Sequence, residues 1–273
     1  MQPLRGKTVI LTGASQGLGA VIARALAAAG AQLALAARSQ EKLDAVTREL
    51  EQQGSHVLSV PCDVTREPDR DALIGRTLDA FGRIDVLVNN AGVEEIRAYA
   101  EQDPATVTRI IETNLLAPML LTRAVLPLML AQKHGCVVNI ASLAGRTGMP
   151  YGAAYAGSKG GLAEWSISLA AELQGNGVTL SVICPGFVAG TGMFARKQTQ
   201  APRSLGTSQP EQVAAAVLRA LSGGQMEIVV NPKPVRLLMA LKALSPRLAI
   251  ALGRRLGLMA FLRRLAQPGR HIS

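Results

Sequence analysis

The chain has 273 residues, of which 48% are hydrophobic and 18% are charged; it has enough apolar material for one compact domain and too little charge for a disordered chain. The formal net charge is +10, but residues 231–273 hold nine Lys/Arg and no Asp/Glu, which leaves 20 basic and 19 acidic residues elsewhere. Because the excess charge is C-terminal and aromatic residues make up only 3%, a nucleic-acid-binding protein is disfavoured.

Strand-like runs alternate with helical patterns through residues 1–230. Strands are expected at 7–12, 32–37, 56–61, 85–88, 136–141, 178–184 and 226–231, and helices at 17–29, 40–53, 68–81, 104–132, 152–174 and 210–222. The strands are rich in Val, Leu and Ile without clean alternation, which is typical of strands buried on both faces. The pattern predicts an α/β fold, a doubly wound parallel sheet of Rossmann-like type, in a single domain.

This domain is expected to end near residue 230, where the β-α alternation stops and a helical, basic C-terminal appendix, residues 231–273, begins. The long irregular segment at about 187–209 is expected to be a functional lid. The chain enters its first strand with no room for a signal peptide and has no uncharged apolar run of 18 residues, so we expect a cytoplasmic protein. The cysteines and histidines match no metal or disulfide spacing, and no metal is expected.

A glycine-rich turn follows the first strand. Thr12–Gly19 reads TGASQGLG, and a helix begins inside it. Glycines let the backbone approach a pyrophosphate, and the helix N-terminus offers free N–H groups to it. The position of this turn between the first strand and the first helix predicts a dinucleotide site.

Several motifs together resemble the short-chain dehydrogenase/reductase family. TGASQGLG is similar to its TGxxxGxG turn, NNAG at Asn89–Gly92 matches a second signature, and four residues fall where the catalytic tetrad of that family would, namely Asn114, Ser142, Tyr155 and Lys159. The resemblance covers roughly residues 5–230. It implies an oxidoreductase that moves a hydride between a nicotinamide and a small-molecule carbonyl or alcohol.

The end of the second strand bears on the choice of nicotinamide. NAD users carry a carboxylate about 20 residues beyond the glycines, whereas here Arg38 and Ser39 follow Ala37. Arg38 would attract a 2′-phosphate, so NADP is favoured over NAD, the alternative being that Arg38 is a solvated loop residue. The resemblance also places Asp63 at the adenine, although it could equally be a helix N-cap.

Taken together, the glycine turn and the resemblance predict a set of cofactor-binding residues at the ends of the strands: Gly13, Ser15, Gln16, Gly17, Leu18, Gly19, Arg38, Ser39, Asp63, Val64, Asn90, Ala91, Gly92, Tyr155, Lys159, Pro185, Gly186 and Val188.

The catalytic hypothesis centres on Tyr155. Lys159 lies four residues later, on the same helical face, where its ammonium is expected to lower a phenol pKa that is ordinarily about 10. Tyr155 is therefore predicted to be the general acid/base. Ser142 would polarise the carbonyl, its alternative role being a turn or cap residue. The resemblance implies a proton relay through Lys159 and Asn114.

The resemblance also implies a substrate pocket made of Val93, Leu143, Met149, Tyr151, Met193 and Phe194. Most of these are apolar, so a lipophilic ketone or secondary alcohol is expected, with core packing as the alternative role of these residues. Helices 104–132 and 152–174 resemble those of the family's dimer interface, which implies a homodimer or homotetramer.

The appendix contains two amphipathic stretches. Leu248, Leu252 and Leu256 share one helical face, and a second apolar face follows after Gly257. One interpretation is an anchor on an anionic membrane surface, which would make a cytoplasmic protein membrane-peripheral. The other is an arm that packs on its own subunit or a neighbour. Two rival hypotheses for the whole protein are a cofactor-binding scaffold without turnover and a protein whose tail is its main function.

Overall fold

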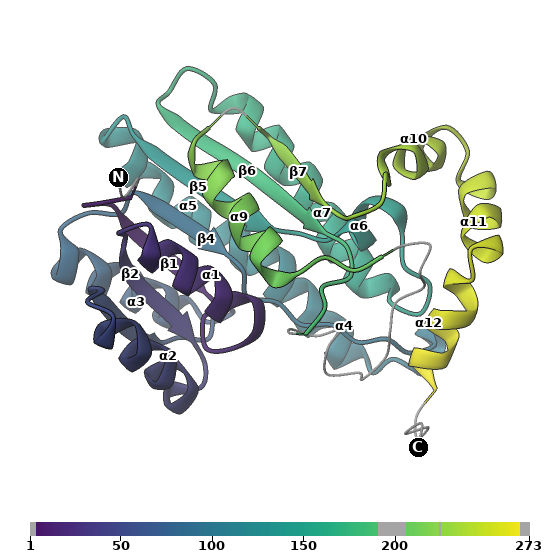
Figure 1. The fold of residues 1–273 in the computed structure, drawn as a ribbon, viewed down its shortest axis with the longest axis horizontal. Coiled ribbons are helices and arrows are strands. Elements are labelled where there is room, and N and C mark those ends of the chain that lie inside the picture. The colour runs from purple at the N-terminus through teal and green to yellow at the C-terminus, as the bar shows by residue number, and fades with distance from the viewer. Residues whose placement is uncertain (1–3, 191–205, 224, 268–273) are drawn as a thin grey trace.

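A computed structural model describes residues 4–190, 206–223 and 225–267 of the chain. In this part, seven parallel strands form one sheet in the order β3-β2-β1-β4-β5-β6-β7 (Figure 1). The strands are β1 (Thr8–Thr12), β2 (Gln32–Ala37), β3 (Val57–Pro61), β4 (Val86–Asn89), β5 (Gly135–Ile140), β6 (Val178–Pro185) and β7 (Glu227–Val230). The strand order reverses between β1 and β4, which creates a crevice at their carboxyl ends.

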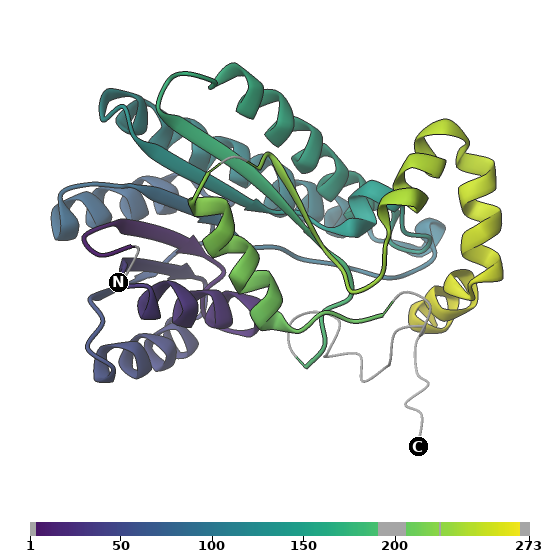
Figure 2. The same ribbon diagram turned by 45° about the horizontal axis from the view of Figure 1, so that its top comes forward.

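Helices cover both faces of the sheet (Figures 1 and 2). One face carries α1 (Gly17–Ala28), α2 (Gln40–Gln52) and α9 (Pro210–Leu221), and the other carries α3 (Glu67–Phe81), α5 (Ala117–Ala131) and α7 (Ala153–Glu172). Along β1, Val9 and Leu11 pack into the first layer and Ile10 into the second. Both faces of each strand are therefore apolar, which explains the unbroken hydrophobic runs. The predicted fold class is confirmed.

The helix expected at 104–132 is three consecutive segments. α4 (Pro104–Ile111) leads into a π-helical turn, η2 (Glu112–Leu116), and α5 follows. The stretch Pro104–Ala131 is long and apolar enough to cross a membrane by length and composition alone. It packs on the sheet through Leu121 and Val125, as a covering helix does. π-helical turns are rare and occur mostly at functional sites, and this one holds Asn114.

Two short elements, η1 (Tyr99–Glu101) and α6 (Leu143–Thr147), were not predicted. The C-terminal appendix forms three helices, α10 (Arg236–Leu244), α11 (Pro246–Arg255) and α12 (Leu258–Ala266). They form an arch at the end of the molecule away from α2 (Figure 2).

The arch is not a loose arm. Phe261 and Leu262 of α12 are buried, and the Phe261 ring meets Phe187 edge-on at a centroid distance of 5.7 Å. Leu248 of α11, by contrast, is 59% exposed. Packing on the chain's own domain is thus observed for α12, while the leucine face predicted in α11 lies open.

Candidate active site

One large cavity, of about 520 Å³, opens at the carboxyl ends of the strands. All of the residues predicted to bind the cofactor line it, and so do Ser142, Val93, Leu143 and Met149. The fold therefore brings together side chains that lie as far apart in the sequence as the first and the sixth strands.

The glycine turn is built for a close approach of the backbone. Gly13 and Gly17 have φ of +67° and +60°, in the left-handed region that favours glycine. A Cβ on Gly19 would overlap the carbonyl oxygen of Gly13. Asn90 ties the NNAG segment to this turn, since its Nδ2 donates to the carbonyl oxygens of Thr12 and Gly13 at 3.0 and 3.2 Å. A phosphate group can thus come close to α1.

Positive charge gathers where β2 ends. Arg38 and Ser39 line the cavity, and so does Lys42 of α2, which was not predicted from the sequence. Burial alone would raise the pKa of Asp63, but hydrogen bonds from Thr65 and the charges of Arg38 and Arg66 lower it. Asp63 Oδ1 accepts from the Thr65 amide at 3.0 Å.

The proposed N-cap role of Asp63 is wrong, because the residue that caps α3 is Arg66, three positions later. The Asp63 carboxylate instead closes a turn ahead of the helix, in the manner of an Asx-turn, by binding the amide two residues on.

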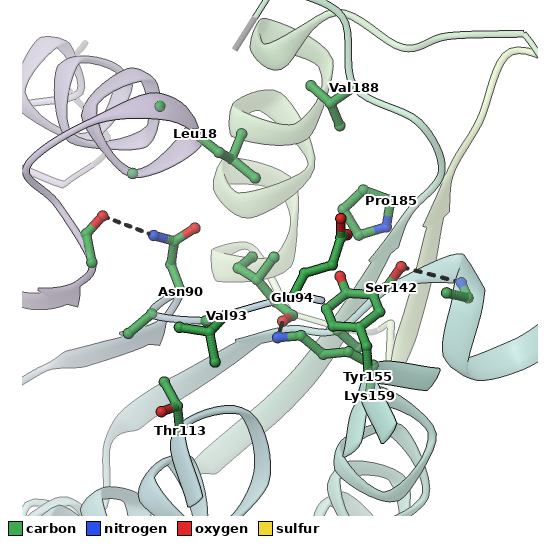
Figure 3. A pocket seen from close by; sticks show the side chains of 18 of the residues that line it. Leu18, Asn90, Val93, Glu94, Thr113, Ser142, Tyr155, Lys159, Pro185 and Val188 are labelled. Atoms are coloured by element: carbon green, nitrogen blue, oxygen red, sulfur yellow. Dashed lines mark hydrogen bonds between the residues drawn. The ribbon is translucent and has the colours of Figure 1, made fainter. Parts of the chain in front are cut away.

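Tyr155 and Lys159 project from α7 into the cavity and are almost completely buried (Figure 3). Lys159 Nζ donates to the carbonyl oxygen of Ile140 at 2.7 Å. Burial lowers the pKa of Lys159 to about 8.

The expected lowering of the Tyr155 pKa is wrong for the chain by itself. Burial raises that pKa, the carboxylate of Glu94 raises it further by repelling the phenolate, and a hydrogen bond with Ser142 partly opposes both. The Lys159 ammonium is turned toward the main chain of β5. Figure 3 shows Glu94 beside Tyr155 and Ser142. Tyr155 is therefore held as a neutral phenol near pH 7.

Ser142 combines both of the roles that were considered for it. Its Oγ accepts from the amide of Ala144 at 3.1 Å and so caps the short helix α6. It also lowers the pKa of Tyr155 and so partly opposes the effect of burial. A hydroxyl has two acceptor lone pairs and one donor, so capping fixes the oxygen in place and leaves its hydrogen for another oxygen in the cavity.

Asn114 lies behind the cavity wall and is fully buried. Its Nδ2 donates to the carbonyl of Val93 and its Oδ1 accepts from the Val93 amide, both at 2.8 Å. Nδ2 also donates to Ser158 Oγ at 3.0 Å. A Cβ on Gly92 would lie 3.2 Å from Asn114 Oδ1 and 3.5 Å from Lys159 Nζ. Asn114 thus clamps the segment that follows NNAG and lies close to Lys159.

The predicted substrate pocket is only partly assembled. Tyr151 lies outside the described lining of the cavity; it has φ of +64°, and its hydroxyl accepts from Arg263 Nε at 2.9 Å. Met193 and Phe194 lie outside the described residues, as does 191–205 of the predicted lid.

Other residues that line the cavity were not predicted from the sequence, among them Glu94 and five from the appendix, namely Asn231, Val235, Leu238, Leu258 and Leu262. The second apolar face predicted after Gly257, which contains Leu258 and Leu262, was the available signal for the last two.

Comparison with known sequences agrees with this geometry. The family model described as short chain dehydrogenase matches residues 7–202. The chain belongs to the short-chain dehydrogenase family. It is therefore an oxidoreductase by family.

Among its curated relatives is the ketoacyl reductase HetN of Nostoc sp., 40% identical over 272 residues, which cover 98% of this chain and 95% of that protein. Another is the 3-oxoacyl-[acyl-carrier-protein] reductase of Synechocystis sp., 39% identical over 190 residues, which cover 69% of this chain and 77% of that protein.

Two solved structures are also similar. A metagenomic short-chain oxidoreductase in complex with NADP has a TM-score of 0.73 and 37% identity, with 85% of this chain and 100% of that chain covered. A tryptophan variant of actinorhodin polyketide ketoreductase with NADPH has a TM-score of 0.76 and 30% identity, with 84% and 97% covered.

Proposed function

We propose that this chain is an NADP-dependent reductase of ketones. The observation that carries the proposal is the convergence of Tyr155, Ser142 and Lys159 on the cavity that the glycine turn enters. The relatives support the same reaction, because they are named as ketoacyl reductases. Both similar solved structures hold the cofactor in its NADP or NADPH form.

The residues present fit this cofactor. Gly13 and Gly19 leave room where a side chain would block the approach to α1. Arg38 and Lys42 offer positive charge for a 2′-phosphate, and the tip of β2 has no carboxylate that would prefer a free ribose hydroxyl. NADP is therefore favoured over NAD.

The cofactor supplies the hydride, and the chain supplies the proton. The phenol of Tyr155 donates its proton to the carbonyl oxygen as negative charge develops there. The Ser142 hydroxyl donates a hydrogen bond to the same oxygen and orients it. The raised pKa of Tyr155 keeps it protonated near pH 7, which is the state that reduction requires. We propose that Lys159 returns a proton to Tyr155 and that Asn114, which lies close to Lys159, supports this relay.

We further propose that the ketone is lipophilic. Apart from Glu94, the part of the cavity that would hold the ketone is lined by apolar side chains, which include Val93, Met149, Leu258 and Leu262. Glu94 introduces one carboxylate beside the reacting groups, which would repel an anionic group next to the carbonyl. An uncharged ketone on an apolar chain matches both features.

We propose that the chain forms a homodimer or homotetramer in the cytoplasm and that its subunits contact one another through α4, α5 and α7. The apolar side chains of Ile111, Leu116 and Leu120 are 37%, 46% and 39% exposed along this surface. Light scattering of the purified chain tests it, and a monomer at micromolar concentration would contradict it.

The reaction is tested by following NADPH absorbance with a panel of ketones of rising chain length, using the native chain and Tyr155→Phe. We expect turnover that Tyr155→Phe lowers by roughly 10²–10⁴-fold, the usual contribution of general acid catalysis, with NADPH affinity retained. Turnover that survives in Tyr155→Phe would refute the mechanism. A preference for short, charged ketones would refute the lipophilic substrate alone.

A further inference from the structure

The appendix is strongly basic where it faces solvent. Residues 231–273 carry nine Lys/Arg and no Asp/Glu. Arg247, Arg254 and Arg255 of α11 are exposed. The described part of the appendix thus presents positive charge without a compensating acid of its own.

The same surface is apolar to a degree found nowhere else in the described chain. Six of the twelve exposed large hydrophobic side chains lie between residues 237 and 256. Leu237 and Leu244 of α10 are 79% and 86% exposed, and Leu248 and Ile250 of α11 are 59% and 54% exposed. Monomeric proteins rarely leave aliphatic side chains gathered in this way unless the surface binds something.

The fold holds this surface outward. α11 packs chiefly on α10 and α12, turning Ala249 and Gly253 inward. The arch is fixed at both ends, by Lys242 Nζ donating to the carbonyl oxygen of Arg146 at 3.1 Å and by Arg263 Nε donating to the hydroxyl of Tyr151 at 2.9 Å. Figures 1 and 2 show α11 as the outermost helix at this end of the molecule.

Three kinds of partner could cover the surface. A second copy would bring two positively charged arches together, which like-charge repulsion opposes. An acidic protein would satisfy the arginines but gives no reason for exposed leucines on two successive helices. An anionic bilayer satisfies both, because leucines enter the acyl boundary while arginines remain among the headgroups.

We propose that α10 and α11 dock the protein on an anionic membrane surface. The exposed leucines of α10 and α11, among them Leu237, Leu244 and Leu248, insert, and Arg247, Arg254 and Arg255 bind the headgroups. Leu238, Leu258 and Leu262 from the same arch line the cavity, so docking brings the cavity close to the bilayer. The proposal concerns binding and does not depend on the reaction.

Vesicle flotation of the full chain tests the proposal, with phosphatidylcholine alone and with phosphatidylcholine containing phosphatidylglycerol. One variant, R247Q/R254Q/R255Q, removes charge from the arch, and a matched control removes three exposed arginines elsewhere, R5Q/R48Q/R219Q. A third variant, L237Q/L244Q/L248Q, removes the apolar contacts. All nine positions are exposed, and circular dichroism verifies that each variant is folded.

We expect binding to the anionic vesicles, with a partition coefficient lowered about a hundredfold by the arch charge variant, since each basic residue near such a surface contributes about fivefold. The leucine variant should lose at least tenfold, and the control should lose much less than the arch charge variant. No binding to anionic vesicles would overturn the proposal. Equal losses of vesicle binding in the control and the arch charge variant would also overturn it. So would a leucine variant that binds vesicles as well as the native chain does, or one that changes only the oligomeric state. An arch that binds polyglutamate but not vesicles would assign it to an acidic protein instead.

Discussion

We expect cofactor selectivity to depend on two cations near the end of β2, Arg38 and Lys42, and replacing Arg38 with glutamine tests this expectation. Arg38 is exposed and lines the cavity. Hydrogen bonds to charged groups contribute about 1.5–3 kcal/mol, and exposure reduces that contribution. We therefore take about 1.4 kcal/mol for Arg38, which is roughly a tenfold loss of NADPH affinity. Lys42 is a more mobile point charge, and Lys42→Gln is expected to cost about fivefold.

The dissociation constants of NADPH and NADH, measured by nucleotide fluorescence, separate this effect from a general loss of binding. NADH lacks the 2′-phosphate, so its affinity should stay within about twofold of the native value in both variants. Arg48→Gln is the matched control, because Arg48 is exposed on α2, the helix that holds Lys42, but does not line the cavity. Equal losses for both nucleotides, or an Arg48→Gln variant as impaired as Arg38→Gln, would refute the reasoning.

Three further predictions follow from the packing and the charges. In Gly19→Ala, the new methyl overlaps the Gly13 carbonyl, so NADPH affinity, measured by titration, should fall at least about tenfold. The control is Gly75→Ala, which has open space around its Cβ; it should keep the NADPH affinity, and its free energy of unfolding in urea should rise by about 0.5–1 kcal/mol. An unchanged NADPH affinity in Gly19→Ala would contradict this prediction. Glu94→Gln removes a charge that raises the Tyr155 pKa. Alcohol oxidation needs the phenolate, so the rise of kcat/KM with pH in that direction should move to lower pH in the variant. An unchanged pH profile would show that Glu94 does not raise the Tyr155 pKa. Asp85 is buried, and although burial raises its pKa, hydrogen bonds from Thr8 and Arg83 lower it overall, so Asp85→Asn should cost about 2 kcal/mol at neutral pH. Urea midpoints of the variant and the native chain should start to converge as pH falls below about 4, the ordinary pKa of Asp, and should meet only at a lower pH, where the native carboxylate with its lowered pKa becomes protonated; a cost that stays constant with pH would argue against the ion pair.

The sheet could be predicted from the sequence because its signals are local. Each strand is a short run of branched aliphatic residues buried on both faces, and the observed bounds differ from those expected by one residue at most. The π-helical turn could not be predicted in the same way. Asn114, within this turn, reaches across to the main chain of Val93, a contact made between distant parts of the chain. An asparagine inside an apolar helix was the only local sign of it.

The site likewise has features that could be predicted from the sequence and features that could not. The glycine turn, NNAG, Tyr155 and Lys159 are recognisable because each motif has a fixed spacing. The direction of the Tyr155 pKa was not predictable, since it depends on burial and on Glu94, which arrives from the segment after β4. Spacing along α7 placed Lys159 one turn away but gave no sign that its ammonium would turn to Ile140.

The two halves of the cavity also differ in what they are built from. The half of the cavity near α1 is built largely from backbone, where Gly13 and Gly19 leave no room for variation. The opposite half is built from side chains of α6, the segment around Glu94 and the arch, whose contribution includes Leu258 and Leu262. These glycine positions tolerate little substitution, so the motif itself fixes the shape of the half near α1. Side chains on separate segments can vary independently, and the arch is where this chain would set its preference among ketones.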